Sequence, residues 1–123
     1  MFYEQDWILR QISIIIKFIR SLLSKESNVY EQDEEQTVFK EEIEKLIELN
    51  RLKEANSLIV KTSKDKDVLA LGLWFYDLLN DLSDKKLEEG ALAREDILKG
   101  LRTLLYNSDR VDNSVVDIII NKY

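Results

Sequence analysis

The sequence predicts an all-α fold of antiparallel helical hairpins. Proline is absent and only three glycines occur among the 123 residues, so the residues that interrupt helices most strongly are scarce. Apolar residues recur at steps of three and four along most of the chain, which is the spacing of one helix face. We therefore expect about five or six helices in a single domain over residues 1–123.

The first helix is predicted from Tyr3 to Ser24. Its inner face consists of isoleucines and leucines at helical spacing: Ile8, Ile12, Ile15, Ile19, Leu22 and Leu23. Two flanking rows widen the apolar arc past half of the circumference: Trp7, Ile14 and Phe18 on one side, Leu9 and Ile16 on the other. We expect no membrane span, because charged residues break the run of roughly 18 apolar residues that a span needs: Arg10, Lys17 and Arg20.

An acidic linker is predicted over residues 25–37, between this amphipathic helix (residues 1–24) and a helical-hairpin core over residues 38–123. The segment offers only Val29 and Tyr30 for burial and carries a dense run of acidic side chains. Such a composition favours a loop.

The core is predicted to open with a helical hairpin. One helix begins near Thr37, and the next runs from Leu52 to about Thr62. Because only Asn50 and Arg51 separate the two helices, we expect them to be antiparallel neighbours.

A strongly apolar helix is predicted next, capped by Asp65 or Asp67 and reaching about Leu82. It is the candidate for the central buried helix. A short turn of helix from Ser83 to Leu87 should follow, with Gly90 in a left-handed conformation at its end.

Two segments complete the expected fold. A helix is predicted from Ala93 to Tyr106. Ser108 or Asp109 should cap the last segment, which is rich in β-branched residues and fits either a helix or a strand.

The segment from Leu46 to Ala55 resembles the turn between the two helices of a tetratricopeptide hairpin, in which a polar turn is followed by a leucine and then by an alanine at the close helix crossing. The resemblance implies a tetratricopeptide-like bundle. It is confined to one hairpin, because no second copy follows at about 34 residues.

Three segments together are similar to a family of small all-helical proteins of unknown function, found mostly in Gram-positive bacteria: Tyr3–Ile12, Trp74–Asp77 and Arg94–Leu101. The resemblance spans nearly the whole chain. It implies an all-helical, cytoplasmic bacterial protein and supplies no catalytic residues.

Missing residue types exclude much chemistry. Without histidine or cysteine the chain holds no catalytic triad, no thiol nucleophile, no zinc finger and no imidazole base. The lack of disulfides favours the reducing cytoplasm. We expect a protein that is not an enzyme and has no cofactor.

Charge is distributed unevenly along the chain, whose net charge is −6. Residues 1–25 carry four basic and two acidic side chains, and residues 26–48 carry nine acidic and two basic ones. An acidic protein gains nothing from phosphate neutralisation, so we expect no nucleic-acid partner.

Acidic side chains at helical spacing provide the one enzymatic alternative: Glu41, Glu42 and Glu44, then Asp77, Asp81 and Asp84. Such oxygen ligands suit Mg²⁺ or Mn²⁺, as in metal-dependent nucleotide hydrolases. We favour a solvated polar face instead and expect no bound metal, because a paired second cluster is missing.

The sharper hypothesis concerns the first helix, whose apolar arc is wider than one packing surface requires. We expect a protein-interaction or scaffolding module, with a homodimer or partner interface formed by Trp7, Ile8, Ile14, Ile15, Phe18 and Leu22. Full burial within the monomer and peripheral binding to a membrane surface remain as alternatives. A partner groove could form at Trp74 and Tyr76, although burial of both is the simpler expectation.

Overall fold

The computed structural model describes the backbone over residues 2–24 and 34–122, and side chains over residues 7–23 and 34–120. These ranges contain seven α-helices and no strand: α1 (Phe2–Ser24), α2 (Glu34–Glu48), α3 (Leu52–Ser63), α4 (Leu69–Asn80), α5 (Asp84–Glu89), α6 (Arg94–Asn107) and α7 (Asn113–Lys122). The all-α prediction is confirmed. The expected number of helices was too low, because the short α5 is a helix of its own and the β-branched C-terminal segment is helical.

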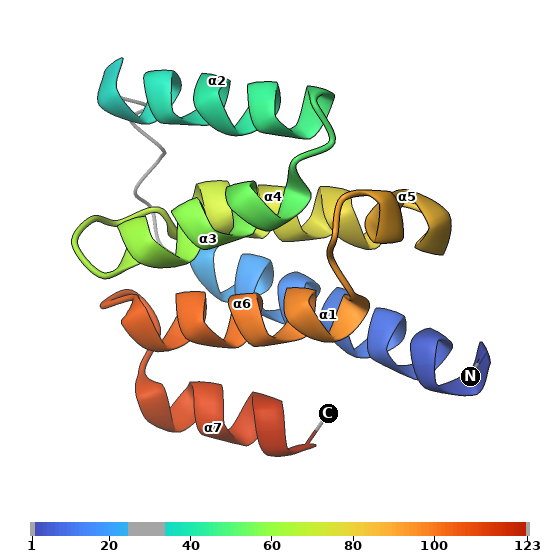
Figure 1. Ribbon diagram of the computed structural model, residues 1–123. Coiled ribbons are helices and arrows are strands. Elements are labelled where there is room, and N and C mark those ends of the chain that lie inside the picture. The colour runs from blue at the N-terminus through green and yellow to red at the C-terminus, as the bar shows by residue number, and fades with distance from the viewer. Residues whose placement is uncertain (1, 25–33, 123) are drawn as a thin grey trace.

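The centre of the fold is α6, which packs against α1, α3, α4 and α7 (Figure 1). The helix expected at the centre, α4, packs mainly against α1 and α6. At the periphery, α2 packs mainly against α3, and the two run in opposite directions as the short turn between them predicts.

Close approach at the centre depends on small residues. A Cβ atom on Gly100 of α6 would lie 2.3 Å from the hydroxyl of Tyr76 on α4 and 2.6 Å from Oδ1 of Asn56 on α3. The Tyr76 hydroxyl donates a hydrogen bond to Asn56 Oδ1 at 2.6 Å. Three helices therefore meet at one polar contact, for which Gly100 leaves the space.

Two predicted helix ends differ in detail. Gly90 has φ −85°, and the left-handed residue after α5 is Ala91, with φ 59°. Gly90 is needed for a different reason, since a Cβ atom there would lie 2.5 Å from the Leu52 side chain. The first turn of α7 is capped by Asp112, not by Ser108 or Asp109, and the Asp112 carboxylate accepts hydrogen bonds from the amide and the hydroxyl of Ser114.

Other predicted boundaries lie close to the observed ones. Asn50 has φ 57° in the turn between α2 and α3, and the Asp67 carboxylate accepts a hydrogen bond from the first amide of α4. The structure begins α2 at Glu34, so residues 34–37 are helical instead of linker. Residues 25–33 of that predicted linker lie outside the described part of the chain.

Within the described ranges, no helix combines the length and the apolar character that crossing a membrane requires.

Candidate interaction surfaces

The outer row of α1, defined here as Trp7, Ile14 and Phe18, is exposed. Their exposed fractions are 60%, 43% and 42%. The three residues lie on one helix face because they are separated by seven and four residues. Large apolar side chains are thus collected on one side of α1 and face solvent.

The six residues predicted as an interface differ in their burial. Trp7, Ile14 and Phe18 are exposed and Leu22 is half-buried, but Ile8 and Ile15 are buried in the core of the same chain. Their place on the inner arc of α1, which packs against α4 and α6, removes these two from any surface. The predicted interface is therefore reduced to the outer row, with Leu22 at its edge.

Gln11 lies next to the outer row along the helix, four residues after Trp7 and three before Ile14. Its side chain is buried, with 6% exposed, and its Oε1 atom has no hydrogen-bond partner in the described part of the structure. A buried amide oxygen without a donor typically destabilises the folded state by about 1–3 kcal/mol. The α1 helix thus carries both exposed apolar and unsatisfied polar groups.

Positive charge borders the outer row. Arg10 and Lys17 are exposed, lie within one helical turn of Ile14, and form no ion pair with any side chain in residues 7–23 or 34–120. Arg20, about one helical turn after Lys17, pairs with Asp77 of α4 at 3.0 Å between Nη1 and Oδ2. The charges next to the outer row are therefore available to a partner.

The two residues of the predicted groove, Trp74 and Tyr76, differ in burial. Tyr76 is fully buried, its ring packs edge-on against Phe75, and burial raises the pKa of its hydroxyl. Trp74 is half-buried, and Lys40 of α2 lies with its Nζ 4.9 Å from the centre of the Trp74 ring. Burial of both residues was the simpler expectation, and it holds for Tyr76, whereas Trp74 stays partly exposed.

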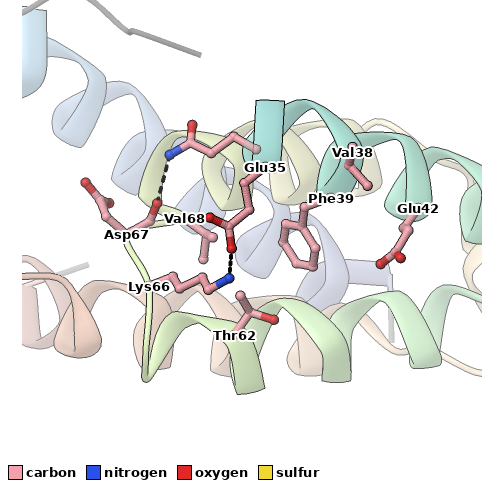
Figure 2. A pocket seen from close by; sticks show the side chains of 9 residues that line it. Glu35, Val38, Phe39, Glu42, Thr62, Lys66, Asp67 and Val68 are labelled. Atoms are coloured by element: carbon pink, nitrogen blue, oxygen red, sulfur yellow. Dashed lines mark hydrogen bonds and ion pairs between the residues drawn. The ribbon is translucent and has the colours of Figure 1, made fainter. Parts of the chain in front are cut away.

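A cavity of about 510 Å³, here called the α2 pocket, opens where the first turns of α2 meet the end of α3 and the loop before α4 (Figure 2). Apolar and polar side chains from these elements line it: Glu35, Gln36, Val38, Phe39, Glu42, Thr62, Lys66, Asp67 and Val68. Figure 2 shows Phe39 reaching from α2 toward Thr62 of α3. Sequence reasoning missed this pocket because its walls come together only when α2 folds back over α3.

The rim of the α2 pocket is acidic. Lys66 pairs with Glu35, and Gln36 donates a hydrogen bond to the backbone oxygen of Asp67 at 3.3 Å. Arg110 approaches Asp67 at 3.6 Å from outside the pocket lining. Glu42 is exposed and forms no ion pair within residues 34–120. A free carboxylate therefore stands beside apolar pocket walls.

Arg94 is the buried charged residue that sequence reasoning did not single out. Its Nη1 donates to the backbone oxygen of Asn80 at 3.0 Å, Nη2 donates to that of Leu82 at 2.7 Å, and Nε pairs with Asp84 at 3.0 Å. Asn80 in turn donates to the backbone oxygen of Leu9 at 3.1 Å. This network holds the end of α4 against α1, α5 and α6, so its role is structural.

The acidic clusters weighed for metal binding are not assembled. Within the described residues, no group of three or more acidic side chains is close enough together to hold a metal ion. Asp77 and Asp84 are engaged instead by Arg20 and Arg94.

Comparison with protein families gives a match over most of the chain. The sequence pattern of a group described as "Family of unknown function (DUF6483)" matches residues 2–108, which is most of the chain. The chain belongs to this family. The DUF6483 match includes all three segments in which the resemblance was seen, and it ends before α7 begins at Asn113. Searches of curated proteins and of solved structures find no match.

Proposed function

We propose that this protein is a non-catalytic association module that binds a second copy of itself through the outer row of α1. The observation that carries the proposal is the exposure of Trp7, Ile14 and Phe18 on one helix face. Clusters of large exposed apolar residues with a polar border are typical of protein contact sites.

A second copy is the proposed occupant because the chain carries the complementary charge itself. Arg10 and Lys17 border the outer row, whereas α2 carries six acidic and two basic side chains. Opposite charges on two surfaces of one chain favour contact between copies.

The molar mass in solution tests the proposal. Light scattering on the full chain should give a mass above the 14.5 kDa of one chain, and Phe18→Asp should be folded and monomeric. Ile118→Asp is the matched control, because Ile118 is an exposed apolar residue on α7, outside the outer row. A wild-type chain that stays at 14.5 kDa at high concentration would refute self-association.

We also propose that the α2–α3 hairpin packs in the manner of a tetratricopeptide hairpin. Full burial of Leu52 and Ala55 on α3 supports this. Ala55→Leu should then lower the free energy of unfolding by about 1–3 kcal/mol, because a close crossing has no room for the added atoms. A neutral effect in urea denaturation would argue against close packing.

A cytoplasmic location is part of the proposal, supported by the absence of cysteine. Fractionation of the source cells would test it.

A further inference from the structure

The outer row and the charges beside it define what a partner surface must offer. Large apolar side chains call for an apolar hollow, and Arg10 and Lys17 call for carboxylates at its edge. Two copies of α1 placed face to face would instead bring these cations toward one another. The composition of the row thus disfavours contact between two identical α1 faces.

The α2 pocket meets both requirements. Its apolar walls include Val38, Phe39 and Val68, and Glu42 lies at one end of it, whereas Glu35 is already paired with Lys66 (Figure 2). At about 510 Å³ it has the size of pockets that receive ligands, ample for one aromatic side chain. Glu42 has no ion pair in the described structure and can meet a cation from outside.

A second hollow, of about 420 Å³, lies beside α5 and α6 and is also bordered by acidic residues. Two of its three carboxylates are engaged, because Asp84 pairs with Arg94 and Asp96 accepts a hydrogen bond from the Ala93 amide, which leaves Glu88. Its large apolar side chains, Leu87 and Leu92, are buried in the core, whereas Val38 of the α2 pocket is exposed. The α2 pocket is therefore the better match for the outer row.

Resting on the proposed function, we infer that an aromatic side chain of the outer row of α1 in one copy inserts into the α2 pocket of the next, with Arg10 or Lys17 opposite Glu42. The two contacting surfaces are different, so the contact is head-to-tail. Such contacts continue from copy to copy until they close into a ring or form an open chain.

A mixing experiment tests the pairing, because each copy carries both surfaces. Phe18→Asp removes the inserting surface. The double variant Val38→Lys, Glu42→Lys removes the receiving one, at two exposed positions whose substitution leaves the core intact. Its matched control is Glu48→Lys, Leu49→Lys, which makes the same charge change at exposed positions at the other end of α2.

Each variant alone should be monomeric at 14.5 kDa by light scattering, with a wild-type circular dichroism spectrum. An equimolar mixture should double that mass and stop there, since each chain then has one working surface. The control should retain the wild-type mass. The wild-type association should also weaken as salt is raised, because exposed ion pairs are screened.

The outcomes separate this inference from the proposed function. A pocket variant that still associates like the wild type, while Phe18→Asp is monomeric, overturns the pocket but keeps the outer row. A mixture of two monomeric variants that stays monomeric also overturns the head-to-tail pairing. Unchanged association of Phe18→Asp overturns both proposals.

Discussion

Arg94 Nη1 lies 3.0 Å from the backbone oxygen of Asn80, the last residue of α4. The last carbonyl groups of a helix have no partner within the helix, and here a side chain from α6 supplies the donors. Because Nη2 and Nε reach Leu82 and Asp84 in addition, one guanidinium joins three helices.

Arg94→Met should therefore lower the free energy of unfolding by about 3 kcal/mol, since it leaves buried carbonyl oxygens without donors. Urea denaturation measures the change. Arg102→Met, at an exposed arginine of the same helix, is the control and should have little effect. A loss of similar size in both variants would show that the Arg94 network has no special role.

Gly100→Ala should destabilise the protein by about 1–3 kcal/mol, although alanine is normally the better helix residue. The reason is the clash of the new methyl group with Tyr76 and Asn56. Thermal unfolding of Gly100→Ala and of the neighbouring exposed Lys99→Ala gives the comparison. A rise in stability at position 100 would contradict the close contact of the three helices.

Gln11→Met should raise the free energy of unfolding by about 1 kcal/mol, because it replaces an unsatisfied buried amide with an apolar side chain of similar shape. Gln11→Glu should have the opposite effect, since it places a charge in the same site. Denaturant titrations of both variants test the pair. Destabilisation by methionine would indicate that the Gln11 oxygen has a donor after all.

Acid should weaken the start of α7. Hydrogen bonds from the Ser114 amide and hydroxyl lower the pKa of Asp112 in the folded state. The unfolded pKa is about 3.9, so this contribution to stability is fully present above that pH and is lost as pH falls through the lower folded value. The stability difference between wild type and Asp112→Ala should thus shrink from pH 7 to below about pH 3. Equal differences at both pH values would contradict this cap.

Binding to membranes is expected to be absent despite the aromatic residues and cations on α1, because the chain as a whole is acidic. Flotation with vesicles rich in phosphatidylserine should leave the protein in the soluble fraction. Co-flotation that is lost in Phe18→Asp would instead assign the outer row to a lipid surface.

The sequence predicts helices where apolar residues recur at regular spacing within one segment. The inner face of α1 follows directly from three- and four-residue spacing, and Ile12 and Ile19 on it are fully buried. The same periodicity could not decide which part of a wide apolar arc stays exposed. That division depends on where α4 and α6 lie, which no local pattern specifies.

Features formed by distant segments escaped prediction. Gly90 was expected to be needed for a left-handed backbone conformation in its own turn. Instead, its missing side chain leaves space for the side chain of Leu52, which is distant in the sequence. The α2 pocket likewise is lined by residues from different elements, such as Phe39 of α2 and Val68 of the loop before α4. Neither relationship leaves a periodic signal, because each exists only after the hairpins have packed.

Because α2 packs mainly against α3, the free energy of local unfolding should differ between parts of the molecule. Amide protons of α2 should exchange with solvent through a partial opening that leaves α6 folded, while those around Leu101 should exchange only on global unfolding. If copies join at the α2 pocket, association would slow amide exchange in this peripheral helix.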